Sequence, residues 1–166
     1  SKLLVLLPAI ILLWANLHPT FILALALLAV FAVAIHLDRV ILIPGRRTPD
    51  IKMALQAWLL LALCFGASLI NPNFFELHQS ILNLGSSEYF MRFHEEWMSP
   101  DFREAGPQIL LLGLGVMLLA AFFVKPRWGF FELLSLSFLT FLTLQSVRVL
   151  PLLGIALALP VSQALS

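Results

Sequence analysis

The sequence predicts an all-α protein, a polytopic transmembrane helical bundle of about six membrane segments with a partly helical outer loop. The mean hydropathy of the chain is +0.99. Only 11% of the residues are charged, whereas soluble domains carry about 25%. Apolar runs recur along the whole chain and are separated by short polar segments. Strands of a barrel would alternate in polarity, and these runs do not, so the runs predict helices.

Each predicted membrane segment is an apolar run bounded by polar residues. A helix needs about 20 residues to cross a hydrocarbon core of about 30 Å, and several runs are shorter. Tilt, local thinning of the bilayer or re-entrant geometry would accommodate them. The first run, which contains Pro8, is the weakest candidate. In chain order the six segments are Leu3–Leu17, Phe21–Leu37, Met53–Ile70, Ile109–Val124, Phe130–Val147 and Val149–Ala164.

Residues 1–166 are interpreted as a single transmembrane domain. The chain starts with "SKLLVLLPAI", without an initiator methionine, and both of its ends are apolar. No small-residue cleavage site follows the first run, which argues against a signal peptide. We therefore expect the chain to be a fragment of a longer membrane protein, whose missing N-terminal half would be its partner.

The distribution of lysine and arginine predicts the orientation in the membrane. If the chain starts inside, seven basic residues lie on the inner side and three on the outer side. The loop 38–52 is then cytoplasmic, and the loop 71–107 is periplasmic or extracellular. The inner basic residues are Lys2, Arg39, Arg46, Arg47, Lys52, Lys125 and Arg127, and the outer ones are Arg92, Arg103 and Arg148.

Several partners and prosthetic groups are disfavoured by composition and spacing. A net charge of +1, with no basic patch that contains aromatic residues, predicts no nucleic-acid partner. The single cysteine, Cys64, provides neither a disulfide framework nor a thiolate metal site. His18 and His36 lie at opposite ends of one predicted helix, about 27 Å apart, and cannot share a haem iron. We expect no metal and no cofactor.

The polar stretch "FHEEWMSPDFRE", residues 93–104, does not match the motifs of intramembrane hydrolases. A zinc protease needs H-E-x-x-H, and Met98 occupies the position of the second histidine. A prenyl-peptidase motif E-E-x-x-x-R would need arginine where Pro100 stands, and "LGSSE" lacks the second glycine of a rhomboid motif. Glu95 and Glu96 are left as candidates for binding a hydroxylated or cationic ligand, with a solvated loop surface as the alternative.

The turn "WANLHPT", residues 14–20, has two interpretations. As an interfacial turn it would use Trp14 as a membrane-belt anchor, Asn16 as a helix C-cap and Pro19 as the first residue of the next helix. This interpretation leaves His18 unexplained. In the alternative, Asn16 and His18 line a polar cavity at the membrane edge.

The loop 71–107 is predicted to form a structured outer cap. Its 37 residues are rich in aromatic and aliphatic side chains, unlike a disordered tether. Asn71-Pro72 should end the third segment, and residues 74–84 should form an amphipathic helix in the membrane interface. Pro100 with Asp101 should open a second short helix. The apolar face of the first helix would comprise Phe74, Leu77, Ile81 and Leu84.

Arg148 lies between the last two apolar runs, close to Pro151. An arginine at a helix end can keep its stem in lipid while its charge reaches the interface. In the alternative, its guanidinium binds an anionic head group from the outer side, because it matches phosphate bidentately. The spacing alone leaves both interpretations open.

Four motifs in chain order resemble the second half of a family of bacterial polytopic membrane proteins. They are "LWANLHPTF", "LINPNFF", "EEWMSPDF" and "RVLPLLGIALALP". The family pattern is approximately W-x-N-x-H-G, N-P-x-G, E-W-x-S-P and R-N-x-P, followed by an apolar run that ends in proline. These proteins are grouped with C-type glycosyltransferase-like membrane proteins, which take sugars from polyprenyl-phosphate carriers on the outer face of the membrane.

The resemblance covers nearly the whole chain, with three departures. Pro19 and Phe74 stand where the pattern has glycine, and Val149 stands where it has asparagine. Enzymes of this class carry their catalytic Asp or Glu in the first outer loop, for which this chain has no counterpart, so the catalytic residue is unknown. The matching residues are Trp14, Asn16, His18, Asn71, Pro72, Glu96, Trp97, Ser99, Pro100, Arg148 and Pro151.

The resemblance implies an integral protein of the bacterial inner membrane, the membrane-embedded part of a glycosyltransferase-like protein that uses a lipid-linked sugar. Its partners would be membrane lipid and a polyprenyl-phosphate sugar. Arg148 would contact the carrier phosphate, Asn16 and His18 would line the cavity, and Glu96 with Trp97 would lie at the acceptor or sugar site. The alternative is a non-enzymatic membrane module, such as a scaffold, an accessory subunit or a transporter half. Whether the chain is an enzyme stays open.

Overall fold

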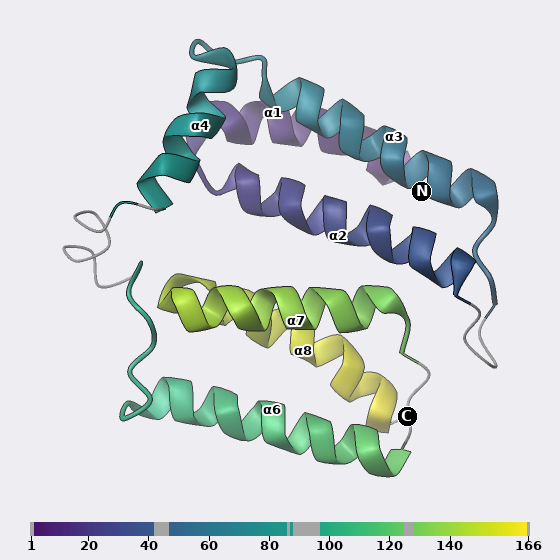
Figure 1. Ribbon diagram of the computed structural model, residues 1–166, viewed down its shortest axis with the longest axis vertical. Helices are drawn as coiled ribbons and strands as arrows, with labels where there is room; N and C mark the ends of the chain where they lie inside the picture. The colour runs from purple at the N-terminus through teal and green to yellow at the C-terminus, as the bar shows by residue number, and fades with distance from the viewer. Residues whose placement is uncertain (1, 42–46, 86, 88–96, 125–127, 166) are drawn as a thin grey trace. The chain divides into compact units, whose positions relative to one another are not determined.

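The computed structural model describes residues 2–41, 47–85, 87, 97–124 and 128–165 (Figure 1). Within these ranges the chain forms seven α-helices with short 3-10 turns and contains no strand, which confirms the all-α class. Two compact units can be distinguished, Ser1–Ser87 and Glu88–Ser166. The predicted cap 71–107 is therefore divided between the units. A single domain over the whole chain stays a prediction.

Unit 1 is a small helical bundle with α3 (Ile51–Ser68) at its centre. This helix packs against both α1 (Leu7–Leu17) and α2 (Phe21–Val40). A 3-10 turn, η1 (Lys2–Leu6), leads into α1. Pro8 lies in the first turn of α1, where backbone N–H groups have no partner within the helix, so the missing N–H of proline costs no hydrogen bond. Pro8 thus starts the helix instead of interrupting it.

The fourth helix of unit 1, α4 (Phe74–Gly85), crosses the end of the bundle at which α3 ends (Figure 1). It confirms the predicted helix over 74–84. Leu77 and Ile81 pack against the core of the unit, as the spacing predicted. The predicted face was only half right, however, because Phe74 and Leu84 are exposed.

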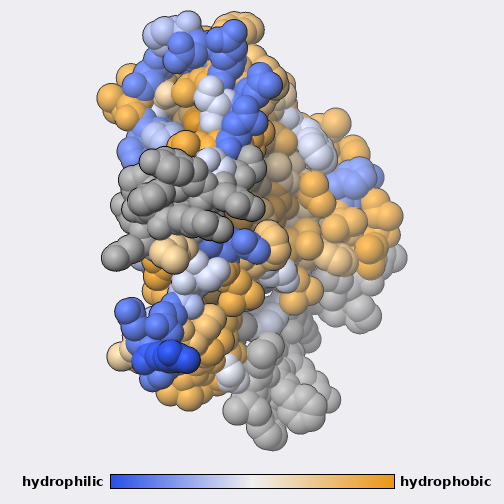
Figure 2. All heavy atoms as spheres, turned by 60° about the vertical axis from the view of Figure 1, so that its left-hand side comes forward, coloured by the Kyte–Doolittle hydropathy of each residue, from blue (hydrophilic) through white to orange (hydrophobic). Residues whose placement is uncertain are grey.

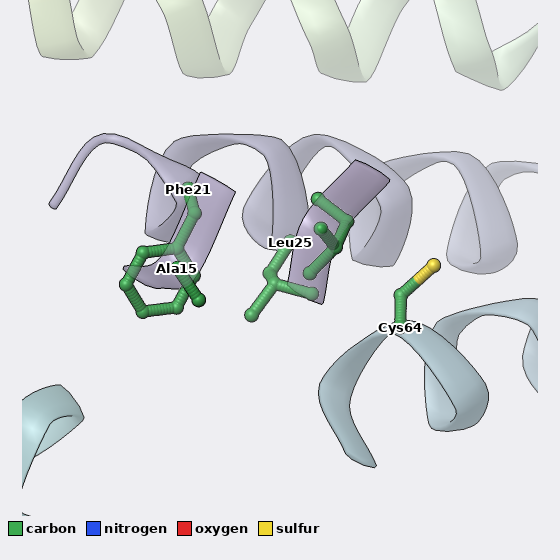
Figure 3. Close-up of a cluster of buried hydrophobic side chains, with 5 residues drawn as sticks. Ala15, Phe21, Leu25 and Cys64 are labelled. Atoms are coloured by element: carbon green, nitrogen blue, oxygen red, sulfur yellow. The ribbon is translucent and has the colours of Figure 1, made fainter. Parts of the chain in front are cut away.

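Among the described residues of unit 1, two buried clusters form the core. One brings together side chains of α1, α2 and α3, and Figure 3 shows Phe21 beside Ala15, with Cys64 projecting from α3 toward α2. The other lies between α2 and α3 and contains three alanines, which let the two backbones approach closely. The members of the first cluster are Ile11, Ala15, Phe21, Leu25 and Cys64, and those of the second are Ala32, Ile35, Ala54 and Ala57.

The described residues of unit 2 form three α-helices. In the chain order, α6 (Ala105–Val124) is followed by α7 (Phe130–Gln145), the short η3 (Val147–Val149) and α8 (Leu150–Leu165). The last helix packs against both of the other two. Along α7 the buried residues recur every three or four positions, so one face of this helix is covered.

Three polar side chains of α7 form hydrogen bonds within the helix or with the residue that precedes it. The Gly129 N–H donates to Glu132 Oε2 at 2.8 Å where the helix begins. The buried hydroxyl of Thr143 donates to the Leu139 carbonyl at 2.8 Å, and Ser135 donates to a carbonyl one turn earlier in the same way. Such bonds let the helix lie in apolar surroundings without unsatisfied hydroxyl groups.

Two helices of the described part of the chain, α2 and α3, are long and apolar enough to cross a membrane by length and composition. Over the residues whose side chains the structure describes, the other apolar helices have 10–17 residues, so six membrane segments stay a prediction. Large apolar side chains are nevertheless exposed, including Leu17 (82%) and Ile155 (70%). Figure 2 shows hydrophobic residues over much of the visible surface, with hydrophilic residues gathered in patches.

Three local predictions were wrong. No helix opens at Pro100, because the Asp101 side chain accepts the Arg103 N–H at 2.9 Å and fixes a turn before α6 begins. Asn16 is not the C-cap of α1, since that position belongs to His18. Pro19 does not begin α2, which starts two residues later.

Phe74 begins α4 with a φ of 49°, the left-handed conformation that costs a non-glycine residue about 1–2 kcal/mol. The Asn71 side chain stabilises this turn by donating to the carbonyls of Ser68 at 2.8 Å and of Phe74 at 3.2 Å. Phe74 is also the position at which the family pattern has glycine. The turn therefore has the backbone geometry that the glycine of the pattern would adopt without strain.

We predict that Phe74→Gly gives a more stable protein than Phe74→Ala, by about 0.5–1 kcal/mol, because only glycine relieves the left-handed strain. Both variants lose the same exposed ring, so the difference between their free energies of unfolding reports the cost of the left-handed backbone conformation. Unfolding in mixed detergent micelles would measure it. Equal stabilities would show that Phe74 is not strained.

Candidate functional site

The turn between α1 and α2 holds a chain of hydrogen bonds that orients His18. The indole Nε1–H of Trp14 donates to Thr20 Oγ1 at 3.2 Å. The Thr20 hydroxyl lies 2.8 Å from His18 Nδ1, and the Thr20 N–H donates to the same nitrogen at 3.2 Å. Because Nδ1 accepts the N–H, the neutral His18 ring carries its proton on Nε2. His18 is exposed, so the turn orients a donor at the surface of the unit.

Asn16 ties this turn to the end of α3. Its side-chain amide donates to the Leu12 carbonyl at 2.8 Å and to the Ile70 carbonyl at 2.9 Å. Both hydrogens of the amide are then used, which leaves Oδ1 as the atom that can accept a hydrogen bond. The bond to Ile70 satisfies a carbonyl beyond the last turn of an apolar helix, where few other donors are available.

His78 is a buried polar residue at this end of unit 1, and sequence analysis did not select it. Only 6% of its surface is exposed, and its Nε2 lies 2.9 Å from the hydroxyl oxygen of Ser68. The position could have been found, because His78 follows Leu77 and precedes Ile81 by three residues on the packed face of α4. A lone histidine within an apolar stripe gave no functional signal.

In unit 2, Arg148 and Trp97 lie together. The guanidinium carbon of Arg148 is 5.5 Å from the centroid of the Trp97 ring, which is a cation–π distance. The Val147 N–H donates to the Met98 carbonyl at 3.0 Å and fixes the segment at 97–98 against η3. Arg148 is exposed and Trp97 is half-buried, so the guanidinium is held at the surface by its aromatic neighbour.

The predicted site residues thus fall in two places. Asn16 and His18 lie on the polar end of unit 1, and Trp97 and Arg148 lie in unit 2. Glu96, like its neighbours His94 and Glu95, lies outside the described residues. Within the described ranges, no group of three or more histidine, cysteine, aspartate and glutamate side chains could hold a metal ion.

Comparisons of the chain with protein families, with curated proteins and with solved structures give no match. The resemblance stated above therefore rests on its motifs alone.

We predict that the contact between Trp97 and Arg148 contributes about 0.5–1 kcal/mol to folding, as an exposed cation–π pair does. A double-mutant cycle with Trp97→Leu and Arg148→Gln, followed by unfolding in mixed micelles, would measure the coupling. The matched control is a cycle of Trp97→Leu with Arg103→Gln, which should show no coupling. Equal coupling in both cycles would contradict a specific contact.

Proposed function

We propose that this chain is the membrane-embedded part of a glycosyltransferase-like protein that takes a sugar from a polyprenyl phosphate on the outer face of a bacterial inner membrane. The observation that carries the proposal is the contact between Arg148 and Trp97. A guanidinium binds phosphate through paired hydrogen bonds, and an indole offers an apolar face with a polar edge to a sugar. One place in unit 2 therefore combines the chemistries that a phosphate-linked sugar requires.

The apolar surface supports a membrane location. In the apolar stretches of α2 and α3 that are long enough to cross a membrane, 28% and 22% of the residues are buried. The core helix of a soluble protein is mostly buried. Each of the seven described helices also exposes large apolar side chains, which lipid would cover without cost. We propose six membrane segments, formed by α1, α2, α3, α6, α7 and α8, with α4 in the outer interface.

The basic residues support the proposed sidedness. The loop 38–52 carries Arg39, Arg46, Arg47 and Lys52, and such an excess favours the cytoplasm. At the opposite end of unit 1 lie α4 and the turn with His18 (Figure 1). This end would then face outward, where the polyprenyl-phosphate sugar is proposed to bind.

We assign different roles to the proposed ligand-binding residues. Arg148 binds the carrier phosphate, and Trp97, with Glu96 beside it in the chain, contacts the sugar or the acceptor. His18 is suited to donate from Nε2 to a phosphate or hydroxyl oxygen, because Nδ1 accepts the Thr20 N–H. Both amide hydrogens of Asn16 are donated to backbone carbonyls. Asn16 is therefore proposed to line the polar cavity at the membrane edge and to accept a hydrogen bond from a ligand hydroxyl at Oδ1. The catalytic carboxylate is proposed to lie elsewhere in the full-length protein.

We predict that a polyprenyl monophosphate raises the thermal stability of the purified protein, whereas the corresponding polyprenol, which lacks the phosphate, does not. Arg148→Ala should weaken the affinity about tenfold to hundredfold, because a hydrogen bond to a charged group contributes about 1.5–3 kcal/mol. Arg103→Ala, which removes another exposed arginine of unit 2, should leave the affinity unchanged. Equal stabilisation by phosphate and polyprenol would contradict phosphate recognition.

A transferase assay of the full-length protein tests the catalytic half of the proposal. Arg148→Ala and Glu96→Gln should each lower the activity, and Arg103→Ala should not. Undiminished activity in both variants would exclude the proposed roles of these residues. Binding of the polyprenyl phosphate without transfer of any sugar would favour the non-enzymatic module.

A further inference from the structure

The residues of α4 form three sides along the helix, and two of these sides have a clear role. One side packs against the core of unit 1 and consists of Leu77, His78 and Ile81. A second side is polar and exposed, and its members recur at the spacing i, i+3, i+4 and i+7 of a single helix face. They are Glu76, Gln79, Ser80 and Asn83.

The third side of α4 is apolar and exposed. Phe75 and Leu82 are seven residues apart, close to two full turns, so they lie in one line along the helix. Their exposed fractions are 55% and 66%. Around the helix axis this line lies between the packed side and the polar side, about 100° from each at 3.6 residues per turn. We call Phe75 and Leu82 the α4 flank.

The α4 flank continues the apolar surface of α3. The Phe75 ring is parallel to the His78 imidazole, with 5.8 Å between the ring centroids. From α3, the Phe65 ring is tilted against the same imidazole at 5.6 Å. Both phenylalanines are exposed on their other sides. Since α3 is long and apolar enough to cross a membrane, the surface that adjoins the flank is one that lipid would cover.

The position of α4 explains the order of its three sides. Its 12 residues give a length of about 18 Å, too short to cross a hydrocarbon core of about 30 Å. The helix instead crosses the end of the bundle at which α3 ends (Figure 1). A helix at the outer end of a membrane-spanning bundle has the bundle on one side, water on another and lipid between them. Packed side, flank and polar side follow one another in this order.

We propose that the α4 flank inserts among the acyl chains of the outer leaflet, with the polar side of α4 in water. The proposal rests on the membrane location given under the proposed function, and it names the side of α4 that meets lipid. The contact is apolar. The sequence of α4 contains no lysine or arginine, so insertion does not require anionic lipid.

Spin labels attached to single cysteines test the proposal in nanodiscs of phosphatidylcholine. The background carries Cys64→Ala, and power saturation compares collisions with oxygen, which dissolves in the acyl region, and with a water-soluble nickel chelate. The label at Leu82→Cys should lie about 5–10 Å below the phosphate groups, the depth of the apolar face of an interfacial helix. The matched control is Ser80→Cys, on the polar side of the same helix, whose label should collide with nickel severalfold more often.

A label at Leu59→Cys, which is exposed in the middle of α3, reports the membrane location independently. The proposal is overturned if the label at Leu82 collides with nickel as often as the label at Ser80. It is also overturned if the label at Leu82 is shielded from both reagents, because protein would then cover the flank. With Leu59 still in lipid, either result leaves the membrane location intact, whereas a water-exposed label at Leu59 contradicts that location itself. If Leu82→Cys does not fold, Phe75→Cys provides a second position on the flank.

Discussion

The carbonyl groups at the ends of apolar helices need hydrogen-bond donors, and this need organises the polar end of unit 1. In unit 1, the amide of Asn16 donates to the carbonyl of Ile70, and the amide of Asn71 closes the reversal between α3 and α4. In unit 2, a bond of another kind holds the backbone: the Val147 N–H donates to the Met98 carbonyl and fixes residues 97–98 against η3. Residues of the proposed ligand-binding motifs therefore also hold the backbone in place. Their substitution changes stability as well as binding, so each functional variant needs a matched control.

The proposed ligand, like the protein, combines a long apolar part with a polar end. A polyprenyl phosphate has a long apolar tail and one charged end, and the protein has helices with exposed apolar side chains and polar residues at the helix ends. Trp97 holds the guanidinium of Arg148 before any ligand arrives, which reduces the conformational entropy that binding would cost. A ligand of this kind would place its tail along lipid-facing helices and its phosphate at Arg148.

The helices could be predicted because apolar runs and the spacing of Leu77 and Ile81 report burial directly. The side-chain details could not. Pro100 did not start a helix, because the Asp101 side chain accepts the Arg103 N–H, which a helix beginning at Pro100 would have needed for its own hydrogen bonds. The contact of Trp97 with Arg148 joins residues that are 51 positions apart, and local spacing contains no information on such pairs. His78 was missed because a histidine on an apolar face is recognised only once its neighbours are known.

Cysteine labelling in spheroplasts tests the central claim, a membrane-embedded chain with an outward-facing site, most directly. The background would carry Cys64→Ala, so that each variant has one cysteine. With a membrane-impermeant maleimide, we expect Ser99→Cys to react in intact spheroplasts and Thr48→Cys to react only after the membrane is opened. Both positions are exposed, so access to the reagent alone should decide the result. Equal labelling of the two positions, or labelling of Thr48→Cys alone, would contradict the account.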